Sequence, residues 1–245
     1  MLEIISLTKK FGSFTAVENL SIKVEAGEIY GFLGPNGAGK TTTIKVIATL
    51  LKPTSGSVKI DGIDAHAFPT EAKKYLSYVP DQPFIYEKLS GMEFLLFIAR
   101  MYAMNEMEAS DSINHVSEVF EVKPWLHRRI EDYSQGMRQR VVLAAAMMHK
   151  PKLIVIDEPM VGLDPRGAET FKSQIKSAVQ DGTAVFLSTH QLSLAKDVCN
   201  RIGIIRSGRL IFDGGMSQFS GDGIERLERK YIELTAEGAQ NGKGA

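Results

Sequence analysis

The sequence predicts an α/β fold: a mainly parallel sheet that carries a phosphate loop, preceded by a β-rich section and interrupted by a helical insertion. An apolar run at 28–33 leads into a glycine-rich turn and then into apolar residues at helical spacing. Two more apolar runs, 153–156 and 183–188, flank an amphipathic stretch at 166–180. Strands that alternate with helices in this way favour a parallel sheet covered by helices.

The pattern along the chain indicates one domain with an insertion. Short β-like runs occupy about the first 65 residues and are set off by Gly and Pro. From about 83 to 150 the apolar spacing becomes helical, and we expect the polar stretch at 105–111 to separate two helices. We expect a single domain over 1–237, with a helical subdomain at about 85–150 inserted between core sections 1–84 and 151–237, and a disordered tail at 238–245.

Residues 34–41 read Gly-Pro-Asn-Gly-Ala-Gly-Lys-Thr and match the phosphate-loop pattern G-x-x-x-x-G-K-[ST]. Glycines let backbone N–H groups converge on phosphates, and the helix that follows adds its partial positive charge. We expect Lys40 to reach the β- and γ-phosphates, Thr41 to ligate Mg²⁺ and Thr42 to donate to a phosphate. The other residues of the loop expected at the nucleotide are Asn36, Gly37, Ala38 and Gly39. A chance glycine turn is the alternative, and the complete pattern between a strand and a helix disfavours it.

Two adjacent carboxylates end the apolar run at 153–156. Side chains alternate along a strand, so Asp157 and Glu158 start in different directions and can take different roles. We expect Asp157 to hold Mg²⁺ through water, as in other phosphate-loop ATPases, and Glu158 to polarise or position the attacking water. Two carboxylates that merely cap a turn before Pro159 are the alternative.

Composition limits the partners of this chain. Its 245 residues carry 29 basic and 29 acidic side chains, so no overall field favours nucleic acid or an acidic membrane, and we expect no nucleic-acid partner. Cys199 is the single cysteine, which excludes an intramolecular disulfide and suits a reducing compartment. The first residues lack the features of a signal peptide, and no apolar run approaches the roughly 20 residues that span a bilayer. We therefore expect membrane contact only through another protein.

Four further motifs follow a characteristic order. Gln82 lies between the first core section and the helical insertion, and Ser-Gln-Gly-Met-Arg-Gln-Arg at 134–140 stands upstream of the acidic strand. Gly-Leu-Asp at 162–164 and His190 come after it. Over nearly the whole chain this order resembles the nucleotide-binding subunits of ATP-binding-cassette (ABC) transporters, with a Q-loop, a signature motif, a D-loop and a switch histidine. The resemblance implies an ATPase that uses ATP and Mg²⁺, with a phosphate-loop (RecA-like) core and an N-terminal antiparallel β subdomain.

The resemblance also implies a role for individual residues. The catalytic group is Glu158, His190 and Gln82, and the metal group is Thr41, Gln82 and Asp157. Ser134 and Gly136 would bind a γ-phosphate held by a second subunit, and Asp164 would lie at the interface between the two subunits. Adenine would stack on Phe11, with Val17 nearby.

Each role has a plainer alternative. Gln82 can be an ordinary loop residue and His190 a structural one, while Phe11 can equally pack within the β subdomain. Ser134 and Asp164 are good N-caps for the helices that follow them, a role that is compatible with a place at an interface.

The signature departs from its commonest form at Tyr133, Gln135 and Met137, which replace leucine, glycine and glutamine. Glutamine does not adopt positive φ as readily as glycine does. We therefore expect ordinary backbone angles at Gln135, since otherwise the shared phosphate site would be distorted.

The resemblance implies two protein partners: a second nucleotide-binding subunit, either a copy or a close paralogue, and a separate polytopic membrane permease that holds the chain at the cytoplasmic face of the cell membrane. We expect Phe84, Ile85 and Tyr86 to contribute exposed apolar surface to a groove for that permease. Segments 136–140, 162–165 and 227–235 look like ATPases of the ABC-2 type, which often serve exporters. A soluble ABC-class ATPase of a ribosome or nucleic-acid machine is the alternative, and a phosphate-loop kinase or GTPase would leave the signature, Q-loop and histidine unexplained.

Overall fold

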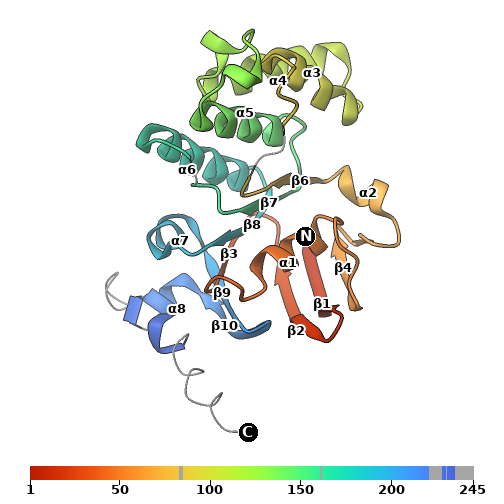
Figure 1. Ribbon diagram of the computed structural model, residues 1–245, viewed down its shortest axis with the longest axis vertical. Coiled ribbons are helices and arrows are strands. Elements are labelled where there is room, and N and C mark those ends of the chain that lie inside the picture. Colours follow the sequence, from red (N-terminus) through yellow and green to blue (C-terminus); the bar gives the residue numbers. More distant parts are fainter. Residues whose placement is uncertain (83–84, 161, 221–227, 230, 235–245) are drawn as a thin grey trace, which may run out of the picture.

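The computed structural model describes residues 1–82, 85–160, 162–220, 228–229 and 231–234. Predictions about Phe84, most of segment 227–235 and the tail at 238–245 lie outside these residues. Within them the chain forms three parts: a helical layer, a mainly parallel sheet and an antiparallel sheet (Figure 1). The predicted fold class is confirmed.

The antiparallel sheet comes from the first part of the chain. Its strands are β1 (Leu2–Phe11), β2 (Phe14–Val24), β4 (Ser55–Ile60) and β5 (Ile63–Asp64), in the order β2-β1-β4-β5. Every pairing in it is antiparallel.

The larger sheet has the order β10-β9-β3-β8-β7-β6. All its pairings are parallel except that of β10 with β9. Its parallel strands all end at one edge, where a site can be assembled from residues far apart in sequence. The strands are β3 (Ile29–Leu33), β6 (Leu76–Val79), β7 (Leu153–Asp157), β8 (Ala184–Thr189), β9 (Arg201–Arg206) and β10 (Arg209–Gly215).

Helices cover both faces of this sheet. On one face α1 (Lys40–Ile47) lies between the two sheets; the other face carries the helical layer (Figure 1). The layer consists of α3 (Gly91–Met101), α4 (Glu106–Val119) and α5 (Gln135–Met147), with short 3₁₀ turns at Lys123–Trp125 and Ile130–Asp132. The remaining helices are α2 (Pro69–Lys73), α6 (Pro165–Gln180), α7 (Leu192–Val198) and α8 (Met216–Ser220).

The parallel sheet separates two hydrophobic cores because its side chains alternate between faces. Ile154 and Ile156 of β7 belong to the core under the helical layer, whereas Leu153 and Val155 belong to the core shared with α1 and the antiparallel sheet. This two-sided burial explains why the strand reads as a continuous apolar run.

Two helices are separated near the predicted stretch, but the break comes earlier than 105–111, because α3 ends at Met101 and α4 begins at Glu106. Asn105 caps α4, and its side chain accepts from the N–H of Glu108, whose own carboxylate accepts from Asn105 N–H. This capping box turns the polar stretch into the first turns of the helix. In the described part of the chain, none of the helices combines the length and apolar character needed to cross a bilayer.

Candidate active site

The phosphate loop connects β3 to α1 and follows a path that only glycine allows at two points. Gly39 has φ +109°, and a Cβ there would lie 2.5 Å from Ala16 O. A Cβ on Gly34 would lie 2.4 Å from Ile205 O. Strands β2 and β9 therefore press against the back of the loop, leaving Asn36, Gly37 and Thr41 exposed on its other side. Ala38 is buried and Thr42 half-buried.

Lys40 lies folded along this loop. Its ammonium donates to Gly34 O at 2.7 Å and to Pro35 O at 3.1 Å. Burial lowers the pKa of Lys40, while the negative charges of Glu158 and Asp157 act in the opposite direction. The lysine thus stands in the field of both predicted carboxylates, at the start of a helix whose N–H groups favour an anion.

Asp157 ends β7 and is fully buried. The hydroxyl of Ser188, on the neighbouring strand β8, donates to its Oδ1. Its Oδ2 is buried without a hydrogen-bond partner among the described residues. A buried carboxylate oxygen is costly to leave unpaired, so the position of this atom suits a cation or a hydrogen-bond donor.

The residues present fit Mg²⁺ bound together with a phosphate. The candidate protein donors, the Asp157 carboxylate and the Thr41 hydroxyl, are oxygens, which Mg²⁺ prefers. Within the described ranges no group of three His, Cys, Asp or Glu gathers as a metal site. Mg²⁺ bound together with a nucleotide usually takes one or two protein oxygens, water and substrate phosphates.

Glu158 turns sharply out of β7. It has φ +49°, a left-handed angle that is uncommon for a residue with a side chain, and its N–H donates to Ser188 O at 3.2 Å. The carboxylate meets His190 Nδ1 at 2.9 Å, and the Thr189 hydroxyl donates to it at 3.4 Å. The end of β8 therefore holds both carboxylates: Ser188 contacts Asp157, while Thr189 and His190 contact Glu158.

The predicted signature segment begins α5. Ser134 caps the helix, with its hydroxyl accepting from Met137 N–H at 3.3 Å, so the N-cap prediction is confirmed. Gln135 is absent from the positive-φ residues, which confirms its ordinary backbone angles. Tyr133, which replaces leucine, is buried; its hydroxyl donates to Trp125 O at 2.9 Å. Ser134 itself is exposed.

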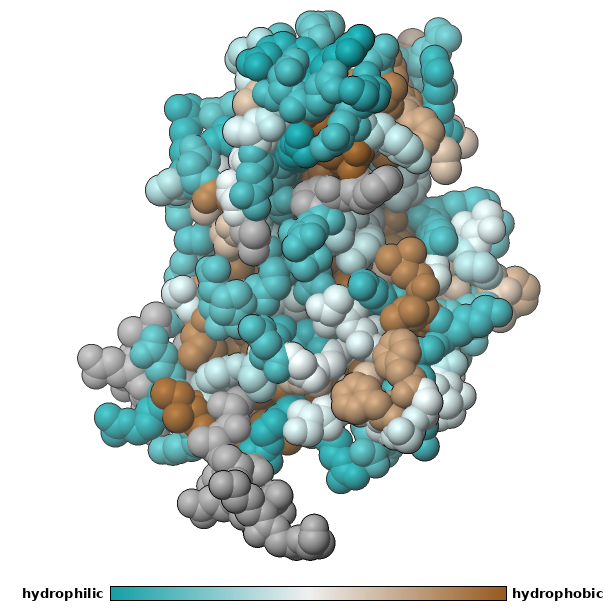
Figure 2. Space-filling view, in the orientation of Figure 1, coloured by the Kyte–Doolittle hydropathy of each residue, from teal (hydrophilic) through white to brown (hydrophobic). Residues whose placement is uncertain are grey.

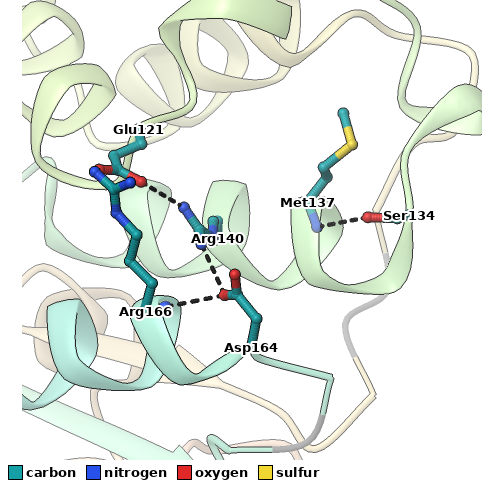
Figure 3. A network of polar contacts seen from close by, with 7 residues as sticks. Glu121, Ser134, Met137, Arg140, Asp164 and Arg166 are labelled. Atoms are coloured by element: carbon teal, nitrogen blue, oxygen red, sulfur yellow. Dashed lines mark hydrogen bonds and ion pairs between the residues drawn. The ribbon is translucent and has the colours of Figure 1, made fainter.

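The predicted D-loop leads into α6. Asp164 caps that helix and accepts from Gly167 N–H at 2.9 Å, as its N-cap interpretation predicts. The same Oδ1 accepts from Arg140 at 2.7 Å (Figure 3). Gly162 has φ +83°, and a Cβ there would lie 2.7 Å from Cγ of Gln135, so the D-loop packs directly on the signature segment of its own chain.

Not every predicted residue is brought to this site. Gln82 is exposed, and within the described residues no hydrogen bond joins its side chain to Asp157, Glu158 or Thr41. Phe11 is 47% exposed and lies under the ammonium of Lys9, so its ring is accessible to a base. Val17 is fully buried and packs behind Gly39, where it supports the loop instead of lining an open surface.

Two groups at the site were not foreseen. Ser188 orients Asp157 and Thr189 contacts Glu158. The only sequence signal for these contacts is the position of both residues directly before His190. Glu121 and Arg140 organise the D-loop from the helical layer (Figure 3), and no sequence pattern links residues so far apart.

A phosphate loop opposed by two oriented carboxylates defines a nucleoside-triphosphate hydrolase. The chain belongs to the ABC transporter family, whose model matches residues 17–161, and it is an ATP-binding subunit of that family that hydrolyses ATP.

Similar proteins support this placement. The chain is 40% identical over 211 residues to the uncharacterised ABC transporter ATP-binding protein YdbJ of Bacillus subtilis, covering 86% of this chain and 68% of YdbJ. It is 35% identical over 229 residues to the bacitracin transport ATP-binding protein BcrA of Bacillus licheniformis, covering 93% and 72%. A dimeric ATP-binding cassette in a post-hydrolysis state with ADP and Pi superposes with a TM-score of 0.80 at 26% identity, covering 88% of this chain and 99% of that one.

Proposed function

We propose that this chain hydrolyses ATP at two sites shared between two ATP-binding subunits, and that the closing and opening of this pair drives export through a separate membrane permease. The observation that carries the proposal is the held carboxylate of Glu158, next to the phosphate loop and in contact with His190. The name of BcrA refers to bacitracin transport, which supports a role in export. The ATP-binding cassette with ADP and Pi is dimeric, which supports the pairing of two subunits.

In this mechanism the phosphate loop and Lys40 bind the phosphates, and Thr42 donates to one of them. Thr41 and Asp157 would hold Mg²⁺, directly or through water, and with Gln82 they form the proposed metal group; bound there, the cation neutralises phosphate charge. Glu158 accepts a proton from the water that attacks the γ-phosphorus, and ADP leaves. His190 keeps the carboxylate in line for that attack.

The second subunit completes the site. Ser134 and Gly136 stand at the start of α5, where the hydroxyl, the N–H groups and the helix N-terminus suit a negatively charged phosphate. Among the described residues no hydrogen bond joins Ser134 or Gly136 to the phosphate loop of the same chain. We assign them to the γ-phosphate bound by the partner, and Asp164 to the interface.

The permease surface is proposed on α3. Ile85, expected to be exposed, is only 7% exposed because it packs into the core, so that expectation is corrected. Tyr86 is exposed and meets Phe97 edge to face, with ring centroids 5.4 Å apart. Leu96 and Met101 are also exposed on α3, and Figure 2 shows apolar side chains along this edge of an otherwise mostly hydrophilic helical layer. Such a cluster suits a helix of a membrane protein lying at the cytoplasmic face of the cell membrane.

The alternative, a soluble ABC-class ATPase of a ribosome or nucleic-acid machine, is not favoured. The chain has no net charge to attract nucleic acid, and the relatives above are named as transporter components. The single-domain assignment over 1–237 remains a prediction.

The variant Glu158→Gln tests the proposal. It keeps the size of the side chain but removes the proton acceptor, so ATP binding should persist, turnover should stop and a closed dimer should accumulate with ATP. Size-exclusion chromatography with and without ATP measures the closed dimer, and phosphate release measures turnover. Unchanged turnover would overturn the role of Glu158, and a monomer at every ATP concentration would overturn the shared site.

A further inference from the structure

Four charged side chains away from the phosphate loop form what we call the α5–α6 ion cluster: Glu121, Arg140, Asp164 and Arg166. Arg140 reaches Glu121 with Nη1 at 3.0 Å and Asp164 with Nη2 at 2.7 Å (Figure 3). Arg166 pairs with the other oxygen of Glu121. Glu121 directly follows the last turn of α4, Arg140 lies in α5, and the other two residues lie at the start of α6.

The cluster joins two parts of the molecule. Among the ion pairs of the described residues, only Arg140–Asp164 and Arg166–Glu121 connect segment 85–150 to the rest of the chain. The helical layer otherwise meets the sheet mainly through apolar packing, which is not directional. The charged contacts therefore add directional constraints on the position of α5 relative to the D-loop.

Arg140 is well held in this cluster. The exposed fraction of its side chain is 15%, compared with 74% for Arg166. Burial opposes its charge, but the hydrogen bonds to Asp164 and Glu121 raise the pKa of Arg140, so the guanidinium stays charged. Because a guanidinium is planar, it fixes the orientation of two carboxylate partners better than an ammonium does.

The surrounding backbone leaves room for this contact. A Cβ on Gly167 would lie 2.7 Å from Oδ1 of Asp164 and 3.3 Å from Nε of Arg140. On the same helix, the amide of Gln139 donates to Pro159 O at 3.3 Å, and Gln135 packs on Gly162. One face of α5 thus contacts the loop between the acidic strand and α6 along two turns.

We propose that Arg140 is a positioning residue for the shared-site reaction: anchored by Glu121, it fixes Asp164 relative to Ser134, so that both meet the partner subunit as one rigid surface. The inference rests on the proposed two-subunit function, which assigns Ser134 and Asp164 to the interface. Arg140 itself contacts neither nucleotide nor partner in this account.

The test uses the full chain carrying Glu158→Gln and measures the ATP concentration that gives half-maximal dimer. Adding Arg140→Met should raise that concentration about tenfold, within the usual range for coupling between sites. Arg140→Lys should recover part of the loss because it restores the charge without the planar fork. Binding of a fluorescent ATP analogue to the monomer should not change, since Arg140 lies away from the phosphate loop.

The matched control is Lys172→Met. Lys172 in α6 also pairs with two carboxylates, those of Glu169 and Asp197, each at 2.9 Å, but outside the cluster. It should leave the dimerisation midpoint unchanged. An equal loss in this control, or an unchanged midpoint in Arg140→Met, would overturn the positioning role.

Glu121→Gln supplies a second, milder variant in case Arg140→Met does not fold, as judged by thermal unfolding. It should weaken dimerisation in the same direction, and the double variant should lose less than the sum of the two single losses, because both changes remove the Arg140–Glu121 contact and only the Glu121–Arg166 pair is lost in addition. Additive effects would overturn the proposal. Failure of the Glu158→Gln parent to dimerise would instead overturn the shared-site function, so the two failures are distinct.

Discussion

His190 and Glu158 are 32 positions apart in the chain, yet Nδ1 of the imidazole lies 2.9 Å from Oε1 of the carboxylate. The contact forms because β7 and β8 are adjacent and parallel, so both residues leave the sheet at the same edge. Glu158 is thereby held from a neighbouring strand, despite its unusual backbone angle.

We expect His190→Ala to reduce kcat roughly a hundredfold, at the lower end for a group that assists proton transfer. The KM for ATP should change little, because the phosphate loop and Lys40 remain intact. Steady-state phosphate release over a range of ATP concentrations separates the two constants. The control His190→Asn keeps a hydrogen-bonding group near Glu158 and should recover part of kcat; full activity in the alanine variant would contradict the assignment.

Gly39→Ala should abolish productive ATP binding. Its φ of +109° and the approach of Ala16 O mean that a methyl group forces the loop to move, and the left-handed angle alone costs about 1–2 kcal/mol. Calorimetry would measure nucleotide affinity, and thermal unfolding would measure stability.

The control for Gly39→Ala is Gly62→Ala. Gly62 also has positive φ, at +79°, but a Cβ there meets nothing within 4 Å, and the residue lies in the turn between β4 and β5, away from the phosphate loop. It should lower stability modestly and leave ATP affinity intact. Equal ATP affinities in the two variants would contradict the steric account.

His149 should make stability depend on pH. It stacks on Tyr102 with ring centroids 3.5 Å apart, and burial lowers its pKa from 6.5 to about 4. Below the unfolded pKa the unfolded chain binds a proton that the native state excludes, so the free energy of unfolding falls as pH drops from above 6.5 towards 4. This difference in pKa corresponds to a loss of at most about 3 kcal/mol in the free energy of unfolding.

Urea unfolding at about pH 7.5 and about pH 5 measures this loss. His149→Phe keeps an aromatic ring on Tyr102 and removes the titrating nitrogens, so its stability should fall less between the two conditions. An identical pH dependence in the variant would show that other groups are responsible.

Phe97→Glu should uncouple transport while leaving ATP hydrolysis by the isolated subunit intact. The side chain is exposed on α3, packs edge to face with Tyr86, and contacts no residue of the phosphate site. Substrate efflux from cells and ATPase activity of the purified chain measure the two effects. Phe68→Glu, an exposed aromatic just before α2, is the matched control and should leave efflux intact. Loss of both efflux and hydrolysis in Phe97→Glu would contradict a docking role.

Local motifs were predictable because the physical reason for each lies in residues next to it in the chain. Gly39 needs a left-handed angle, and Ser134 and Asp164 satisfy free N–H groups at helix starts, so each could be placed from its neighbours alone. The pattern predicts two helices here correctly but places the break too late, because the polar residues at 105–111 suggest a loop, whereas Asn105 and Glu108 form a capping box that starts α4. The prediction for Ile85 failed because its burial depends on packing beneath the helical layer.

The class of chemistry and the order of elements are readable from the chain alone, since the phosphate loop and the acidic strand are each formed by consecutive residues. The groups that hold these motifs become visible only in the folded molecule: Ser188 on Asp157, His190 on Glu158, and Arg140 between Glu121 and Asp164. These contacts join residues distant in the chain, and they exist because sheet order and helix packing bring their backbones together, information that no local pattern contains.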